Sequence, residues 1–319
     1  MIHVREISAF TSDPSGGNPA GVVTRGAENL AARQMQAIAR EMNLSETSFL
    51  LPPRRPGADV GIRWFTPTQE VSLCGHATVA AFHAAAEDGD WGLAGPGTHR
   101  IRLETLSGLL PIEVITKPGL PARIRMGLPD PEPVPFGEIA PFLEAAGLRA
   151  DQLDAGLPAL RSGMYVLLAV RRLESLRDVR PDMSALAAAV AELGGPDGVI
   201  LSCLETLEPS SAVHIRMFAP GAGIDEDPVT GSAQAPVAGW LARIGFFSRK
   251  DAGREGRFRE AGAGRVAYTA EQGDFLGRRG RVDVDLTLAG GRDAASARDV
   301  VISGRAVTVR ELEMRIPRA

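Results

Sequence analysis

Cysteine is scarce in this chain, which has only Cys74 and Cys203 among its 319 residues. Two cysteines are too few for a disulfide scaffold, and these two do not have the spacing of a metal-binding motif. We therefore expect both to be reduced thiols in a protein of the cytoplasm.

Long apolar runs are also missing. No stretch approaches the roughly 20 uncharged apolar residues that a membrane-spanning helix needs. The N-terminal residues 1–7 carry an acid, Glu6, and have the pattern of a strand. They lack the basic start and the apolar centre of a secretory signal. These absences predict a soluble protein without a membrane partner, and they favour the cytoplasm.

Positive charge is not in excess, since the formal net charge is −4. Lys117 and Lys250 are the only lysines, and the arginines are spread along the chain among acids. A nucleic-acid-binding protein would carry a basic field, so we expect no nucleic-acid partner. The apolar fraction of 44% and the charged fraction of 23% are ordinary for a globular enzyme.

An internal repeat is visible in the chain. The sequence Ile-Arg-Trp-Phe-Thr-Pro starts at Ile62, and Ile-Arg-Met-Phe-Ala-Pro starts at Ile215, about half the chain later. Each copy continues with an acidic loop, several small residues and an alanine-rich segment with a helical pattern. The shared order of elements predicts two diverged copies of one unit, because a fixed-distance repeat marks a duplicated architecture.

The patterns along the chain predict many strands and few long helices. Strands are expected at 2–10, 21–24, 47–51, 59–65, 99–116 (a hairpin), 122–127, 164–170, 197–202, 212–218, 265–271, 280–287 and 305–315. Helices are expected at 30–42, 75–87, 182–193 and 230–244. A doubly wound fold would alternate strands and helices regularly, and this chain does not. The predicted fold class is α+β, with two pseudo-symmetric halves that each wrap a curved mixed sheet or barrel around a central helix.

The best domain boundary lies in Lys117-Pro118-Gly119-Leu120-Pro121, because its prolines and glycine interrupt both strands and helices. The expected halves are residues 1–118 and 119–319, and the final strand could return to the first half. We expect the active site between the two halves.

Each half contains a loop that leads into a predicted helix. The first is Cys74-Gly75-His76, and the second runs from Glu226 to Ala233. The free backbone N–H groups at the start of a helix attract anions. In the second loop Pro228 bars an earlier helix start, while Thr230 or Ser232 could cap the helix. Two helix starts facing one cleft would form a site for a small carboxylate.

A third segment, Leu44-Ser45-Glu46-Thr47, places an acid between a helix and an apolar strand. Together with the other motifs it makes the chain resemble the PhzF-like family, named for the phenazine-biosynthesis isomerase. The matching motifs follow one another in order from about residue 8 to residue 280. They are Gly17-Asn18-Pro19-Ala20-Gly21-Val22-Val23, Leu44-Ser45-Glu46-Thr47, Phe65-Thr66-Pro67, Glu70-Val71, Leu73-Cys74-Gly75-His76-Ala77-Thr78, Glu226-Asp227-Pro228-Val229-Thr230-Gly231-Ser232-Ala233 and Glu271-Gln272-Gly273.

The resemblance implies a diaminopimelate-epimerase-like fold and a proton shift without a cofactor or a metal. In the phenazine enzyme a glutamate moves the proton on a dihydro-hydroxyanthranilate ring, and a histidine, an aspartate and a serine assist. The positions that match these motifs are Glu46, His76, Asp227 and Ser232. A homodimer is the family-like expectation.

The chemistry is consistent with these residue types. A glutamate with a pKa of roughly 4.3 is a poor base at neutral pH, so Glu46 would need burial or a neighbouring carboxylate such as that of Asp227. Backbone N–H groups near Gly75 and Gly231 could stabilise charge on the substrate. The substrate is expected to be a small carboxylate, which the sequence does not identify further.

The supporting positions have alternative interpretations. Asn18 could contact the substrate or serve only the turn before it. Cys74 could line the pocket as a small side chain, or it could be one thiol of a thiol-dependent amino-acid epimerase. No second cysteine occurs within 225–235, which argues against a two-thiol mechanism.

Two further alternatives concern metal binding and turnover. His83 is assigned no role, because metal-binding histidine pairs on a helix lie four residues apart rather than seven, as His76 and His83 do. A protein that binds a small carboxylate without turning it over is the alternative from another functional class.

Overall fold

The computed structural model describes residues 1–194, 198–247, 254–289 and 296–316. It divides the chain into two compact units. Unit 1 comprises residues 1–127 and 302–319, and unit 2 comprises residues 128–301. The chain therefore passes between the units twice, and both of its ends belong to unit 1.

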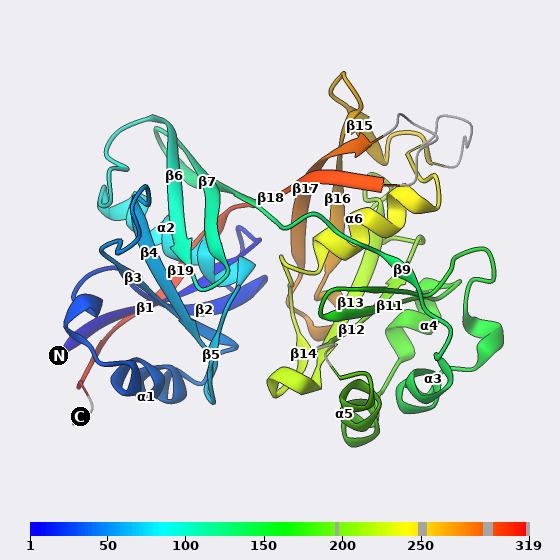
Figure 1. Cartoon of the computed structure of the whole chain (residues 1–319). Helices are drawn as coiled ribbons and strands as arrows, with labels where there is room; N and C mark the ends of the chain where they lie inside the picture. The colour runs from blue at the N-terminus through cyan, green and yellow to red at the C-terminus, as the bar shows by residue number, and fades with distance from the viewer. Residues whose placement is uncertain (195–197, 248–253, 290–295, 317–319) are drawn as a thin grey trace. The chain divides into compact units, whose positions relative to one another are not determined.

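Unit 1 contains a long series of strands and two helices (Figure 1). They are β1 (Ile2–Ala9), β2 (Asn18–Val23), α1 (Ala32–Met42), β3 (Glu46–Leu51), β4 (Val60–Phe65), β5 (Glu70–Val71), α2 (Gly75–Asp88), β6 (Gly97–Thr105), β7 (Gly108–Lys117), β8 (Leu120–Gly127) and the C-terminal β19 (Ala306–Met314). β18 (Ser296–Gly304) crosses the boundary between the units.

Unit 2 has the same mixture of elements with additional helices. They are β9 (Val134–Pro135), α3 (Ala140–Ala146), β10 (Leu160–Ser162), β11 (Tyr165–Ala169), α4 (Leu173–Asp178), α5 (Met183–Glu192), β12 (Gly198–Cys203), β13 (Val213–Ala219), β14 (Ile224–Asp227), α6 (Gln234–Arg243), β15 (Phe258–Glu260), β16 (Arg265–Gln272) and β17 (Gly280–Ala289).

The strands of the two units pair in the same order. In unit 1, β1 pairs antiparallel with β2, β2 parallel with β3, β3 antiparallel with β4, β4 parallel with β6 and β6 antiparallel with β7. In unit 2 the same succession runs through β10, β11, β12, β13, β16 and β17. The predicted duplication is confirmed at the level of topology.

Each unit encloses one helix almost completely. All residues of α2 from Gly75 to Ala85 are buried, and the helix contacts β1, β2, β3, β7, β8 and β19. In α6 all residues from Gln234 to Ala242 are buried. A helix that is buried on every side needs other elements to cover it on every side, and the strands that contact α2 provide that cover in unit 1. The predicted α+β fold with a central helix in each half is confirmed.

The repeated Ile-Arg-x-Phe sequence has the same structure in both units. The Arg63 guanidinium donates two hydrogen bonds of 2.6 Å to Glu70 and lies 5.0 Å from the ring centroid of Phe65. Arg216 donates hydrogen bonds of 2.8 and 2.7 Å to Glu226 and lies 5.0 Å from the ring centroid of Phe218. Each arginine therefore fastens a main strand to the short strand or loop that precedes the buried helix.

The domain boundary that the sequence placed at 118/119 lies inside a hairpin. Lys117 pairs with Leu120 at the turn between β7 and β8, and both strands belong to unit 1. Proline and glycine interrupt a strand equally well at a hairpin turn and at a domain boundary, so composition could not separate the two. The last strand, β19, pairs antiparallel with β1 and belongs to unit 1.

Most of the other predicted elements lie close to their expected positions. The strand predicted at 197–202 starts in the structure at Gly198, and residue 197 lies outside the described residues. The helix predicted from 230 begins only at Gln234. The short helices α3 and α4 and the strand β18 were not predicted. Among the described residues, no helix combines the length and the apolar character needed to cross a membrane.

A buried charged cluster holds together the second half of unit 2. The Glu271 carboxylate contacts His214 Nδ1 at 2.9 Å and accepts hydrogen bonds from the backbone N–H groups of Leu207 and Glu208. Burial alone would raise the pKa of Glu271, but these hydrogen bonds and the nearby Arg281 outweigh it and lower the pKa to about 2. Glu271 thus fixes the loop between β12 and β13 onto β16.

We expect Arg216→Leu to lower the free energy of unfolding by about 3 kcal/mol, because it leaves the largely buried Glu226 carboxylate without its partner. Arg216 also donates to the carbonyl oxygens of Leu176 and Val179, which would lose their donor. The matched control is Arg63→Leu. The Arg63–Glu70 pair is more exposed, so its loss should cost about 1 kcal/mol. Urea unfolding measures the stability of both variants. Equal losses in the free energy of unfolding would contradict the idea that burial makes the Arg216–Glu226 pair the stronger one.

We expect Glu271→Gln to alter the pH dependence of stability. The folded-state pKa lies below the ordinary value, so the stabilisation from Glu271 is present above pH 4.5 and is lost as the pH falls toward 2. The stability gap between wild type and variant should therefore shrink by about 1.4 kcal/mol per pH unit below pH 4.5. Urea unfolding between pH 7 and 3 tests this, with the exposed Glu174→Gln as control. A stability difference between wild type and Glu271→Gln that stays constant with pH would show that Glu271 does not have a lowered pKa in the folded protein.

Candidate active site

Glu46 and His76 lie together in unit 1. Glu46 is the first residue of β3, and His76 is the second residue of α2. The His76 Nε2 atom lies 3.2 Å from Glu46 Oε2. Only 9% of Glu46 and 3% of His76 are exposed to solvent. The structure therefore brings together the two unit 1 residues that the sequence proposed as catalytic.

The surroundings of His76 determine its protonation state. Burial lowers the pKa of His76 from its usual 6.5 to about 3, because the interior penalises the charged imidazolium. The ring is then neutral at neutral pH, and its contact with Glu46 joins a carboxyl group to a neutral imidazole. A neutral imidazole can accept a proton at one nitrogen and donate one at the other.

Cys74 is adjacent to the same histidine. Its Sγ atom lies 3.5 Å from His76 Nδ1, and the side chain is buried. The Cys74 carbonyl accepts hydrogen bonds from the N–H and the hydroxyl of Thr78, which anchors the first turn of α2. The imidazole thus faces a thiol with one nitrogen and a carboxyl group with the other.

These three side chains are also a set that could hold a metal ion. Glu46, Cys74 and His76 each offer one ligand atom, and the three atoms lie within 4.8 Å of one another. His83 does not share this cluster. It is buried further along α2, and its Nε2 atom lies 3.2 Å from Glu87. The structure thus places His83 outside the cluster that contains His76. The expectation of no metal ligands did not consider the combination of Glu46, Cys74 and His76.

The remaining predicted positions of unit 1 surround the start of α2 and of β2. Gly75 is the first residue of α2, so its backbone N–H lies at the helix start that the sequence predicted to attract a small carboxylate. Asn18 is the first residue of β2 and is fully buried. It follows a tight turn at Gly17, where φ is 61° and an added Cβ would approach the Ala9 carbonyl oxygen to 2.2 Å. Only glycine fits there, so this part of the motif serves the backbone.

In unit 2 a chain of hydrogen bonds holds Asp227. The Thr230 hydroxyl donates to Asp227 Oδ2 at 2.5 Å. Gln272 Nε2 donates to the Asp227 carbonyl oxygen at 2.7 Å and to Thr230 Oγ1 at 3.0 Å, while Gln272 Oε1 accepts from the Thr230 N–H at 2.8 Å. Because the amide already donates to Thr230 Oγ1, the hydroxyl hydrogen is directed to Asp227. The network orients Asp227 as an acceptor.

Ser232 has a different partner. Its hydroxyl lies 2.7 Å from the hydroxyl of Tyr165, the first residue of β11. Neither Thr230 nor Ser232 caps α6, because that helix begins later, at Gln234, with Ala233 as its N-cap. Gly231 therefore precedes the helix by a turn, and the helix start that the sequence predicted in this loop lies later in the chain.

Gln272 and Tyr165 are functional candidates that sequence reasoning missed. The Glu271-Gln272-Gly273 motif was visible, but no role was assigned to its glutamine. Gly273 has a φ of 85°, and a Cβ there would come within 2.7 Å of the Pro228 carbonyl oxygen. The motif therefore packs directly on the Asp227 loop. The signal that could have revealed Gln272 is an amide side chain at the end of an apolar strand, directly before a glycine.

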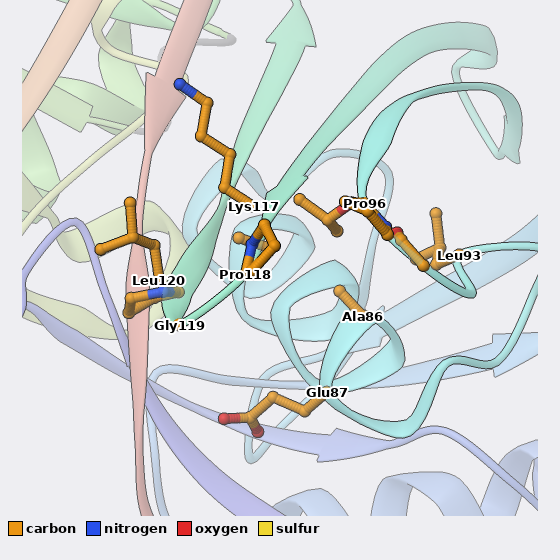
Figure 2. A pocket seen from close by; sticks show the side chains of 12 residues that line it. Ala86, Glu87, Leu93, Pro96, Lys117, Pro118, Gly119 and Leu120 are labelled. Atoms are coloured by element: carbon orange, nitrogen blue, oxygen red, sulfur yellow. The ribbon is translucent and has the colours of Figure 1, made fainter.

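The pocket in Figure 2 lies elsewhere in unit 1. Its volume is about 580 Å³, and its lining extends from α2 to the hairpin turn before β8. Pro96, Pro118 and Leu120 are among its lining residues, and the Lys117 side chain extends away from Ala86. None of the predicted catalytic or substrate-binding residues is among its lining residues. It therefore gives no support to the candidate active site.

Comparison with known proteins places the chain in a family. Residues 7–312 match the family model described as phenazine biosynthesis-like protein, PhzC-PhzF. An uncharacterized isomerase of Salmonella typhimurium, YddE, is 34% identical over 318 residues, which cover 98% of each chain.

Solved structures agree with this assignment. A PhzF-family phenazine biosynthesis protein of Bacillus anthracis is 30% identical, covers 99% of each chain and has a TM-score of 0.81. A probable proline racemase of Agrobacterium radiobacter shares the fold, with a TM-score of 0.64 at 14% identity over 99% of this chain and 94% of its own. This chain belongs to the PhzC-PhzF family of phenazine biosynthesis-like proteins, has their epimerase-like fold and is an isomerase.

Proposed function

We propose that this isomerase shifts a proton on a small carboxylated substrate without a cofactor, with Glu46 as the proton shuttle. The contact between Glu46 and His76, at 3.2 Å in a buried environment, is the observation that carries the proposal. A carboxyl group in contact with an imidazole can both take up and release a proton, which is what a proton shuttle requires.

The other residues have supporting roles in the proposed reaction. His76 lies against the carboxyl group and orients it. The N–H groups at Gly75 and the start of α2 stabilise charge on the substrate carboxylate. Asp227 and Ser232 in unit 2, held by Thr230 and Tyr165, assist the proposed proton transfer. Asn18, Cys74 and Gly231 contribute to substrate binding.

The proposed mechanism needs only side chains and backbone groups of the chain. We propose in addition that the protein acts as a homodimer in the cytoplasm, which rests on the sequence resemblance and on two cysteines that form no disulfide. The class of small carboxylates is supported by the anion-attracting start of α2.

A thiol-dependent epimerase is a second candidate, favoured by the 3.5 Å distance between Cys74 Sγ and His76 Nδ1. A neighbouring imidazole can activate a thiol as an acid or base. The loop from Ile224 to Gly231 contains no cysteine that could act as the opposed thiol. The same segment carries Asp227 instead. The mechanism with Glu46 as the single proton shuttle is therefore the preferred proposal.

We expect Glu46→Gln to reduce substrate-dependent uptake of deuterium from D2O by about 10²–10⁴-fold, because the amide cannot carry the proton. The assay follows the uptake by NMR or mass spectrometry in a panel of small amino and hydroxy acids.

Glu87→Gln is the matched control for this variant. Glu87 lies at the same 3.2 Å from a histidine, His83, but outside the candidate site. This control should keep its exchange rate. Full exchange in the Glu46 variant would refute the proposal. A complete loss in Cys74→Ser, with exchange kept in Glu46→Gln, would favour the thiol mechanism.

We expect Gln272→Leu to lower the exchange rate at saturating substrate by about 10²-fold, because Thr230 and Asp227 lose the hydrogen bonds that fix their orientation. Thr230→Ser keeps the hydroxyl and should retain most of the rate. The measurement is kcat and KM for exchange in the responsive acid. A Gln272 variant with unchanged kcat would show that the glutamine does not orient Asp227.

A further inference from the structure

The side chains of Glu46, Cys74 and His76 combine a carboxylate, a thiol and an imidazole in one buried cluster. We propose that this cluster is an inhibitory site for a divalent cation of the zinc class. The inference rests on the proposed function in one respect, because inhibition follows from capture of the Glu46 carboxylate. Binding of the ion itself does not depend on it.

The ligand types match this class of metal. Zinc is bound in proteins by cysteine thiolate, histidine nitrogen and glutamate oxygen, and thiolate with imidazole disfavours magnesium and calcium. On binding, the Cys74 S–H bond breaks, its proton passes to water and the sulfur forms the bond to the metal. The thiolate and the Glu46 carboxylate then supply two negative charges that balance the dication.

The distances are close to those of a tetrahedral site. Bonds of 2.0–2.3 Å at tetrahedral angles place ligand atoms about 3.3–3.6 Å apart. Cys74 Sγ and His76 Nδ1 are 3.5 Å apart, and all three ligand atoms lie within 4.8 Å of one another. An ion held by the thiol and the imidazole can therefore take the carboxylate after a rotation of the Glu46 side chain. Three protein ligands leave a fourth position for water.

The state of His76 supports a ligand at this place. The residue is 3% exposed, and its Nε2 atom, although 3.2 Å from Glu46 Oε2, makes no hydrogen bond of suitable geometry within the described ranges of the chain. A buried polar atom without a hydrogen bond is unfavourable. A metal ion bound at Nε2, directly or after the ring has rotated, would give this nitrogen a partner. Cys74 is the N-cap of α2 and His76 its second residue, so the helix start positions two of the ligands next to each other.

Cobalt provides a direct test, because Co²⁺ occupies zinc sites and reports a thiolate ligand by near-ultraviolet charge-transfer absorption. The full-length protein, reduced and freed of metal with a chelator, is titrated with Co²⁺ and then with Zn²⁺. We expect one Co²⁺ per chain, a thiolate charge-transfer band and displacement of the cobalt by Zn²⁺.

The two cysteines supply matched variants. Cys74→Ser should abolish the charge-transfer band and raise the Kd for Co²⁺ by more than the 10- to 100-fold that removal of a supporting hydrogen bond costs. Cys203→Ser should keep the band, because Cys203 lies in β12 of unit 2. Circular dichroism checks that both variants are folded. Absence of a band in the wild type, or a band that survives in Cys74→Ser, would overturn the proposal.

Inhibition is measured separately. Zn²⁺ should suppress deuterium exchange in wild type and in Cys203→Ser, and a chelator should restore it. If Glu46→Gln loses exchange but the wild type binds no cobalt, the metal site fails and the proposed function stands. If cobalt binds through Cys74 while Glu46→Gln keeps full exchange, the metal site stands and the proton-shuttle role fails. Bound Zn²⁺ that leaves exchange unchanged would refute the inhibitory role.

Discussion

The burial of one helix inside each unit is the constraint on which the rest of the structure depends. α2 is buried along all positions from Gly75 to Ala85, so strands must cover it on every side. Alanine and glycine permit this, because small side chains let the strands approach closely and leave no polar group to satisfy. The start of the helix then lies at a fixed place in the sheet. Cys74 and His76 meet Glu46 at the start of β3 as a consequence of that enclosure.

The two arginine clamps have the same origin. Each buried helix is preceded by a short strand that pairs with a main strand. In both units an arginine of the main strand, Arg63 or Arg216, binds a glutamate of the short strand and lies against a phenylalanine. Bidentate pairing fixes both position and orientation, which lysine could not do. The clamp is the part of the ancestral unit that both copies keep, and it explains why the Ile-Arg-x-Phe sequence is the most visible trace of the duplication.

The sequence was sufficient to predict the repeat, the fold class and most strands, because these depend on patterns within short windows. Glu46 and His76, which the sequence proposed as catalytic, lie in contact in the structure. The hydrogen bonds between Gln272 and Thr230 could not be predicted. They depend on the parallel pairing of β13 with β16, which are far apart in the sequence. The late start of α6 was missed because Thr230 has the residue type of a helix cap, yet its hydroxyl serves Asp227 instead.

This use of Thr230 shows how the chemistry of the two copies diverged while their topology did not. In unit 1 the residues before the buried helix lead directly into it, so Cys74 and His76 are set by the helix itself. In unit 2 the corresponding residues form a loop that is held from outside the helix by Gln272, and the helix begins only afterwards. A loop held by side-chain hydrogen bonds can present a carboxylate in a defined orientation, because Asp227 is tied through both its backbone and its side chain. The different local structures therefore place a buried carboxyl–imidazole contact in unit 1 and a carboxylate held by a loop network in unit 2.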